Sequence, residues 1–304
     1  MTALAEAWLL AFLLAATLGA GVLAVLASGI LLQERWVEPL RPILSAAARM
    51  MPALPFLALP LLALSGRLYP WADRPRGLVV LVASVVILLL WSVLGRQLAR
   101  PAPARWGAGV ALLLLPLTAA IGFEDWALSR DRGWVGSLNG LAMLIGGAAA
   151  ALGMAVLVHG NPAEPEARTG LERALLALGI FTLWLLFVPF VTVWAADLPA
   201  EAAWYLRRQE GPWQWLNPGL VVSALGAALA LAAVPQWSAW RMRAVCALLV
   251  LQHAGLVLWT VRPDAPLAPG ATGGTPQLLA DAIVIGLVAL LLLLMARVVR
   301  RRGT

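Results

Sequence analysis

Residues 4–32 read LAEAWLLAFLLAATLGAGVLAVLASGILL, an apolar run in which Glu6 is the single charged residue. A bilayer core about 30 Å thick requires roughly 20 consecutive apolar residues in a helix, so this run is long enough to cross it. No basic residue precedes it, and it is far longer than the apolar region of a signal peptide. The sequence therefore predicts a retained first transmembrane helix.

The rest of the chain has the same character. Of its 304 residues, 62% are hydrophobic and 12% are charged, and the mean hydropathy is +0.87. Too little polar surface remains to cover a water-soluble globule, and the alternating pattern of an outer-membrane barrel is absent. We expect an all-α polytopic membrane protein, with residues 1–304 forming a single transmembrane domain of packed helices. The nine candidate spans are 4–32, 43–64, 78–94, 110–123, 134–158, 171–194, 215–234, 245–261 and 278–299.

The arginines predict how these spans are oriented. All 22 basic residues are arginine, and with nine spans the loops on the N-terminal side carry 8 of them and the opposite side 14. Cytoplasmic loops are the arginine-rich ones, so the N-terminus is predicted outside and the C-terminus in the cytoplasm of a bacterial inner membrane. The prediction depends on the run 43–64, which Arg49 and three prolines interrupt. Because the arginines are scattered over short loops, no nucleic-acid partner is expected.

Motifs of a self-contained enzyme are missing from the sequence. A chain without lysine cannot contain a GxxxxGK[ST] loop, and neither GxSxG nor HExxH occurs. The single Cys246 excludes an internal disulfide and a cysteine-ligated cluster held by this chain alone. His159 and His253 fall at different depths, which argues against a bis-histidine haem. We expect no metal site and no cofactor bound by this chain alone. Small residues at 146–153, GGAAAALG, instead predict close helix packing.

Polar and aromatic residues gather at two junctions between apolar runs. Residues 121–134 read IGFEDWALSRDRGW, and residues 194–215 read WAADLPAEAAWYLRRQEGPWQW. The arginine count places both on the outer face. Carboxylates at the end of a span reach water, pair with arginines or carry protons. Neighbouring tryptophans suit a membrane interface and also the wall of a site for a ring-shaped ligand.

The sequence predicts a helix at each junction. If the run 110–123 continues as a helix, Asp125 and Ser129 share a face and Glu124 points about 100° away. In the second junction, Asp197, Pro199 and Glu201 are typical of a helix start. They predict a short interfacial helix near 199–210.

Taken together, the two junctions resemble one family. Asp125, Trp126, Ser129, Asp131 and Trp134 follow the DWxMSLDPHW segment of the quinone-binding membrane subunit of alternative complex III, the F subunit, a relative of the NrfD-type membrane anchors. The second junction is similar to that family's WYxNIPEExxWYLxRxxGxWxW segment. The residues that match there are Trp194, Leu198, Pro199, Glu201, Trp204, Tyr205, Leu206, Arg208, Gly211, Trp213 and Trp215. This chain is shorter than is usual in the family, and Arg132-Gly133 replaces the Pro-His of the first motif.

The resemblance implies a metal-free membrane subunit in a respiratory complex of the quinol:cytochrome c-type oxidoreductase class. Its partners would be an NrfD-like membrane subunit, an iron–sulfur protein and a multihaem cytochrome, with membrane lipid around it and quinone or quinol as its ligand. Electron transport would run through those other subunits, and this chain is not expected to be catalytic alone.

Quinol oxidation releases protons with the electrons, so carboxylates beside an aromatic cleft are suitable groups. The candidate proton-handling residues are Asp125, Asp131, Asp197 and Glu201. The candidate quinone-site or supporting residues are Glu124, Trp126, Ser129, Trp134, Trp204, Tyr205, Arg208, His253 and Asp281. His253 also fits a hydrogen-bonded core histidine, and Asp281 fits the N-terminal acid of the last helix. Two alternatives stay open: an assembly and docking subunit that binds no quinone, and an unrelated small-solute transporter built from inverted repeats.

Overall fold

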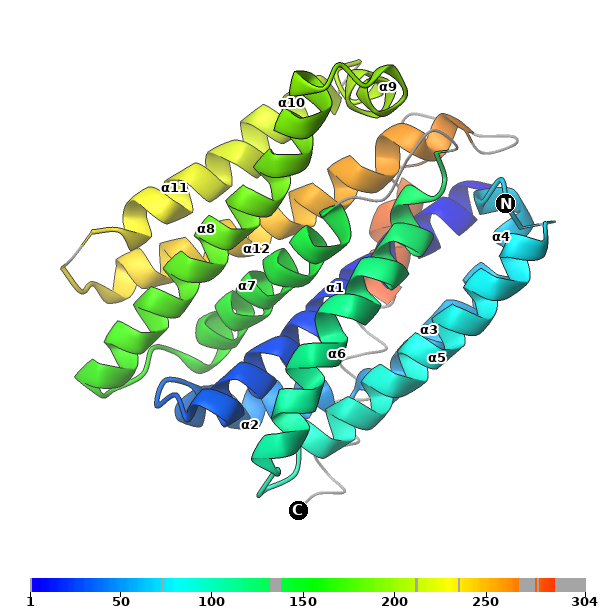
Figure 1. Ribbon diagram of the computed structural model, residues 1–304. Coiled ribbons are helices and arrows are strands. Elements are labelled where there is room, and N and C mark those ends of the chain that lie inside the picture. Colours follow the sequence, from blue (N-terminus) through cyan, green and yellow to red (C-terminus); the bar gives the residue numbers. More distant parts are fainter. Residues whose placement is uncertain are drawn as a thin grey trace.

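The computed structural model describes residues 2–72, 74–131, 138–210, 213–234, 236–267, 277 and 279–287, and the structural statements below concern these residues. They form a bundle of long helices that run roughly side by side, as Figure 1 shows. Eight helical segments are long and apolar enough to cross a membrane. They are Ala3–Leu32, Val37–Ala63, Pro75–Leu98, Arg105–Leu128, Asn139–His159, Pro165–Ala195, Trp213–Ala232 and Ala239–Ala265. The prediction of an all-α, multi-pass membrane protein is confirmed.

The individual helices have the following bounds. They are α1 (Thr2–Leu32), α2 (Val37–Ala48), η1 (Met51–Ala53), α3 (Leu54–Ala63), α4 (Ser65–Leu68), α5 (Pro75–Leu98), α6 (Arg105–Phe123), η2 (Glu124–Leu128), α7 (Asn139–His159), α8 (Pro165–Ala195), α9 (Pro199–Arg207), α10 (Trp213–Leu216), η3 (Asn217–Val222), α11 (Ser223–Ala232), α12 (Ala239–Val261) and η4 (Arg262–Leu267). The predicted short helix near 199–210 corresponds to α9. Most of the ninth predicted span, 278–299, lies outside the described residues.

The proline-rich second run is a candidate span after all, but it is built from three pieces. The 3-10 turn η1 separates α2 from α3, and Pro52 and Pro55 stand in the first turns of η1 and α3. Proline is tolerated in a first turn because its missing N–H has no helical partner there. Together the three pieces make up the single candidate span Val37–Ala63.

Helices α1 and α7 form the centre of the bundle. They are the most buried of the candidate spans. In their most apolar stretches 78% and 72% of the residues are buried, against 28% in the spans that contain α8 and α11. A Cβ added to Gly21 would lie 2.3 Å from the backbone of Gly147, and one added to Gly147 would lie 2.3 Å from the Thr17 carbonyl oxygen. The backbones of α1 and α7 touch where these glycines meet. The close packing predicted for residues 146–153 is confirmed.

The alternating direction of the spans brings the two polar junctions to one end of the bundle. The start of α1, η2, α9 and η4 all lie at that end, which holds the N-terminus in Figure 1. An ion pair between Arg207 of α9 and Asp131 joins the two junctions directly. Residues that are 76 positions apart in the sequence thus belong to one structural unit.

Candidate functional site

The first junction continues α6 as a turn of π-helix. In η2 the backbone N–H of Ser129 donates to the Glu124 carbonyl, five residues earlier. The Ser129 hydroxyl donates to the Asp125 carbonyl at 2.6 Å and accepts from the indole N–H of Trp71 at 2.7 Å. The Asp125 carboxylate lies 3.5 Å from the guanidinium of Arg76 at the start of α5. The helix continues as predicted, but its polar groups are engaged by neighbouring helices.

Trp126 packs in the apolar core between α1, α5 and α6. Its ring centroid lies 5.2 Å from that of Phe12 and 5.8 Å from that of Trp91, and its N–H donates to Ser84 at 2.8 Å. The void beside it has a volume of about 30 Å³. That space is close to the size of one water molecule. The structure therefore does not place Trp126 in the wall of a site that could hold a ring.

Eight buried or half-buried charged side chains form what we call the end cluster. Its members are four arginines and four carboxylates: Arg130, Arg207, Arg208 and Arg262, with Glu6, Asp131, Asp264 and Asp281. The formal charges cancel, as they must where charges are removed from water. The cluster ties together α1, the turn after η2, the end of α9, η4 and the segment that contains Asp281.

Two carboxylates anchor the end cluster. Glu6 of α1 pairs with Arg130 and lies 3.5 Å from Arg262. Asp264 accepts two hydrogen bonds from Arg208 and lies 3.7 Å from Arg207. Neither acid was among the site residues predicted from the sequence. Glu6 carried a signal, since a lone acid inside an apolar span is by default a functional or paired group. Asp264 lies in η4, beyond the predicted span 245–261, and nothing in the sequence singled it out.

The remaining predicted acids have different surroundings. Asp281 pairs with Arg262 and accepts from Gln277 at 2.9 Å, so it belongs to the end cluster as well as to the start of the last helix. Asp197 is exposed, with a left-handed φ of 47°, just before α9. Glu201 stands in the first turn of α9, where its charge complements the helix dipole. Trp134 lies outside the described residues.

A cavity of about 640 Å³ lies between α8 and η3, and we call it the α8–η3 cavity. Its volume is within the range typical of small-molecule sites. Its apolar wall consists of Leu183, Leu186, Phe187, Phe190, Pro218, Val221, Val222, Leu225 and Leu256. Its polar wall consists of Asn139, Tyr205, Arg208, Gln209, Gln214, Asn217 and Trp259. Two residues predicted for a quinone site, Tyr205 and Arg208, therefore do line a cavity together.

The α8–η3 cavity borders the lipid-facing side of the bundle. Phe187 and Val222 line it and are 58% and 51% exposed. Val222 is the last residue of η3, a π-helix that begins at Asn217. π-helical turns occur frequently at functional sites because they open the helical backbone locally. The apolar wall of the cavity therefore includes side chains that belong to the exposed apolar residues of the bundle.

Tyr205 stands at the polar end of the α8–η3 cavity. Its ring lies edge-on to Phe190 and to Trp204, with centroid distances of 5.6 and 4.9 Å. Burial raises the pKa of Tyr205 to about 12. Its hydroxyl is therefore protonated at neutral pH and can both donate and accept a hydrogen bond.

His253 is a core histidine in the middle of α12. Its Nε2 lies 2.8 Å from the hydroxyl of Thr17, and that hydroxyl already donates to the Leu13 carbonyl at 2.8 Å. The Nε2 atom must therefore carry the proton and donate it to Thr17. His159 stands at the end of α7, so the two histidines lie at different depths. Among the described residues, no group of three His, Cys, Asp or Glu side chains is placed to hold a metal ion.

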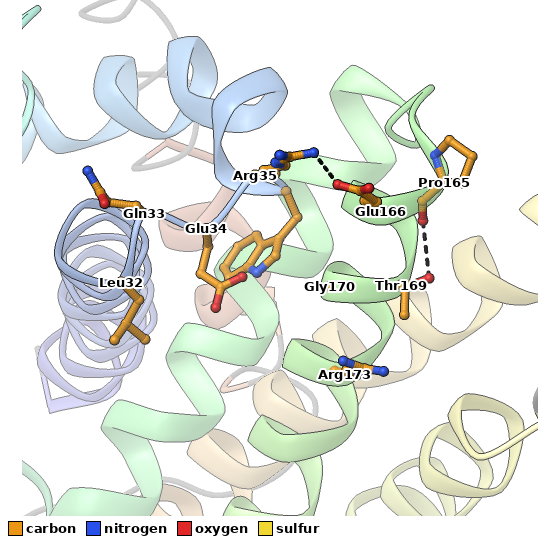
Figure 2. A pocket seen from close by; sticks show the side chains of 10 residues that line it. Leu32, Gln33, Glu34, Arg35, Pro165, Glu166, Thr169, Gly170 and Arg173 are labelled. Atoms are coloured by element: carbon orange, nitrogen blue, oxygen red, sulfur yellow. Dashed lines mark hydrogen bonds and ion pairs between the residues drawn. The ribbon is translucent and has the colours of Figure 1, made fainter.

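A second cleft, of about 480 Å³, lies at the opposite end of the bundle (Figure 2). It separates the loop after α1 from the start of α8, and an ion pair between Arg35 and Glu166 bridges the two. A Cβ added to Gly170 would lie 2.6 Å from Cδ1 of Trp36, so the loop rests closely on α8. Both charges of the bridge are largely exposed to solvent. The rim of the cleft carries both acidic and basic residues. Among the described residues that line it, every buried polar side-chain atom has a hydrogen-bond partner.

Comparison with known proteins adds no relative. Neither the scan against protein-family models nor the search of curated proteins gives a match to this chain. The likeness to the alternative complex III subunit therefore rests on the two sequence motifs described above.

Proposed function

We propose that this chain is an integral membrane subunit of a quinol:electron-acceptor oxidoreductase similar to alternative complex III, and that it binds quinone or quinol in the α8–η3 cavity. Electrons would be carried by the other subunits. The observation that carries the proposal is the cavity itself, which combines an exposed apolar wall with a polar end to which Tyr205 and Arg208 of the second sequence motif contribute.

The shape of the α8–η3 cavity suits a ring with an isoprenoid tail. Phe187, Phe190 and Val222 offer apolar contact on the side that faces lipid. Tyr205, Gln214 and Asn217 offer uncharged hydrogen-bonding groups at the other end. A few placed polar groups in an apolar cavity are the usual composition of a small-molecule site. The polar end would orient the ring and the apolar wall would hold the tail.

The geometry supports binding more than proton handling. Among the described residues, those that line the α8–η3 cavity include no carboxylate and no histidine. Asp131 instead pairs with Arg207, and Asp125 with Arg76. A general base must lie within hydrogen-bond reach of the proton it removes. The proton-handling roles of Asp125, Asp131, Asp197 and Glu201 therefore remain predictions.

Filling the cavity tests the proposed function. Val222→Trp adds a bulky ring at a position that lines the α8–η3 cavity, whereas Leu113→Trp adds the same ring at a lipid-facing position of α6. The purified protein in lipid nanodiscs would be loaded with a benzoquinone that carries one isoprenoid unit, and the retained quinone would be extracted and quantified. We expect Val222→Trp to lose most of it and Leu113→Trp to retain it. Equal retention in all three proteins would contradict the proposal.

An assembly and docking subunit is the second candidate. Trp194 and Trp215 are 77% and 71% exposed on either side of α9, at the end of the bundle. Large exposed rings at such a place can anchor a partner or the membrane interface. This candidate predicts that Trp194→Ala with Trp215→Ala weakens capture of the partner subunits, and that Val222→Trp has no effect on electron transfer from quinol in the assembled complex.

A further inference from the structure

We propose that the cleft at the other end of the bundle, between the loop after α1 and the start of α8, binds the phosphoethanolamine headgroup of a membrane phospholipid. We call it the α1–α8 cleft; residues 32–36 and 165–173 line it. Its volume of about 480 Å³ is within the range of small-molecule sites. The proposal concerns a different site from the α8–η3 cavity and does not depend on quinone binding.

The charges of the α1–α8 cleft leave one group of each sign available. Arg35 pairs with Glu166 across the cleft, so these two charges compensate each other (Figure 2). Glu34 comes from the loop after α1 and Arg173 from α8, and among the described residues neither has an ion-pair partner. A ligand that complements both of them must itself carry a cation and an anion.

Arg173 and Trp36 supply donors for the anionic part of such a ligand. The guanidinium of Arg173 is exposed, and its fork of N–H groups matches the oxygens of a phosphate. The ring of Trp36 is buried against Gly170, where an added Cβ would lie 3.6 Å from Nε1. The Nε1 atom itself keeps access to solvent, and no described residue accepts its hydrogen. A phosphate in the cleft can therefore accept hydrogen bonds from both walls.

Glu34 selects the cationic part of the headgroup. Its half-buried carboxylate can accept hydrogen bonds from a primary ammonium, as a carboxylate does from lysine. A trimethylammonium group has no N–H to donate, and a phosphoglycerol headgroup has no cation at all. We therefore expect phosphoethanolamine to bind more tightly than phosphocholine, and phosphoglycerol to bind most weakly because Glu34 repels its charge.

Arg173 also begins an apolar face of α8 that favours a lipid over a free headgroup. Ala177, Ile180 and Trp184 follow it at i+4, i+7 and i+11, which places all four residues on one side of the helix. All four are exposed, Ile180 and Trp184 by 53% and 51%. A phospholipid held by its headgroup at Arg173 can lay an acyl chain along these side chains and gain apolar contact.

Two charge-removing variants test the assignment. The full-length protein, stripped of lipid in detergent, would be titrated with dioctanoyl phosphatidylethanolamine, phosphatidylcholine and phosphatidylglycerol, and bound lipid would be counted by native mass spectrometry. We expect Arg173→Gln to raise the dissociation constants of phosphatidylethanolamine and phosphatidylcholine by about tenfold, since both lose phosphate contacts. Glu34→Gln should weaken phosphatidylethanolamine alone and abolish its advantage over phosphatidylcholine. Arg96→Gln and Glu38→Gln, exposed at the same end of the bundle, are the matched controls and should change neither.

Several outcomes would overturn the proposal. Equal binding of the three lipids by the unaltered protein would do so, as would an unchanged affinity for phosphatidylethanolamine in either cleft variant. Soluble phosphoethanolamine separates a lipid from a free headgroup: we expect it to displace the lipid only at much higher concentration, and competition at equal concentration would contradict the lipid assignment. Quinone retention should be the same in both cleft variants as in the unaltered protein, so this proposal and the proposed function fail separately.

Discussion

The carboxylate of Asp264 accepts hydrogen bonds from both terminal nitrogens of Arg208, at 3.2 and 2.7 Å, and the two side chains are 0% and 1% exposed. This pair fastens the end of α9 to η4, immediately behind the polar end of the α8–η3 cavity. The second sequence motif is thereby held in place by a residue that lies more than fifty positions away from it.

Removing Asp264 should be strongly destabilising. Asp264→Ala leaves Arg208 buried without its counter-charge, and breaking a buried pair from one side costs about 3–5 kcal/mol. We expect a large fall in the thermal unfolding midpoint of the protein in detergent. Glu166→Ala is the matched control, because its pair with Arg35 is exposed and exposed pairs contribute about 0–1 kcal/mol. Similar midpoints for the two variants would contradict the structural role of the end cluster.

Glu6 should behave as a second anchor of the end cluster. Glu6→Gln keeps the shape of the side chain but leaves Arg130 and Arg262 with less negative charge beside them. We expect a loss of stability on the order of 3 kcal/mol, since the site is buried on all sides. Glu164→Gln removes the same charge at an exposed position and should be neutral. Denaturant unfolding followed by circular dichroism checks both; a neutral Glu6→Gln would show that the cluster does not need this acid.

The contact between α1 and α7 should not tolerate a side chain at Gly147. A Cβ there would lie 2.3 Å from the backbone oxygen of Thr17, which cannot move without shifting α1. Overpacking of this kind costs about 1–3 kcal/mol, so Gly147→Ala should lower the unfolding midpoint. Gly226→Ala in α11 is the control, because a Cβ there meets nothing within 4 Å. It should be neutral or slightly stabilising, since alanine favours helix over glycine.

The two tyrosines should ionise at unusually high pH. Burial raises the pKa of Tyr205 to about 12 and also raises that of Tyr69, and the chain has no other tyrosine. A raised folded-state pKa stabilises the fold below the ordinary tyrosine value near 10, and this contribution is lost as pH rises through the folded-state value. Ultraviolet titration of tyrosinate should show no ionisation below about pH 11 in the folded protein.

A companion variant assigns the tyrosine transitions. Tyr205→Phe should remove the lower of the two transitions and leave that of Tyr69. Because the described lining of the α8–η3 cavity contains no carboxylate or histidine, quinone affinity should stay flat between neutral and mildly alkaline pH. An ionisation near pH 10 in the folded protein would show that Tyr205 is more open to water than its position beside Phe190 and Trp204 indicates.

The sequence predicts the spans well because twenty apolar residues in a row have few other uses. It also predicts that residues 121–134 and 194–215 carry the polar chemistry, and the ion pair between Asp131 and Arg207 brings them together. Sequence position sets the depth of a residue but not the rotation of its helix. For this reason Trp126 could not be assigned to the core, nor could Arg208 and Tyr205 be assigned to one cavity wall.

Other parts of the site depend on long-range pairing that leaves no local pattern. Asp264 follows Arg262 by two residues, yet its partner is Arg208 of another helix end. Trp259 lies near the end of an ordinary apolar run, and only the packing of α12 against η3 and α8 shows that it borders a cavity. The π-helical geometry of η3 likewise follows from how α10 and α11 are joined around Pro218, which periodicity alone does not reveal.

The central claim is that quinone occupies the α8–η3 cavity, and a density map of the assembled membrane complex with bound quinone tests it most directly. We predict ring density between α8 and η3, with the ring at the polar end beside Tyr205, Gln214 and Asn217 and the tail leaving past Phe187 and Val222. Quinone density elsewhere in the complex, with a lipid chain filling this cavity, would contradict it.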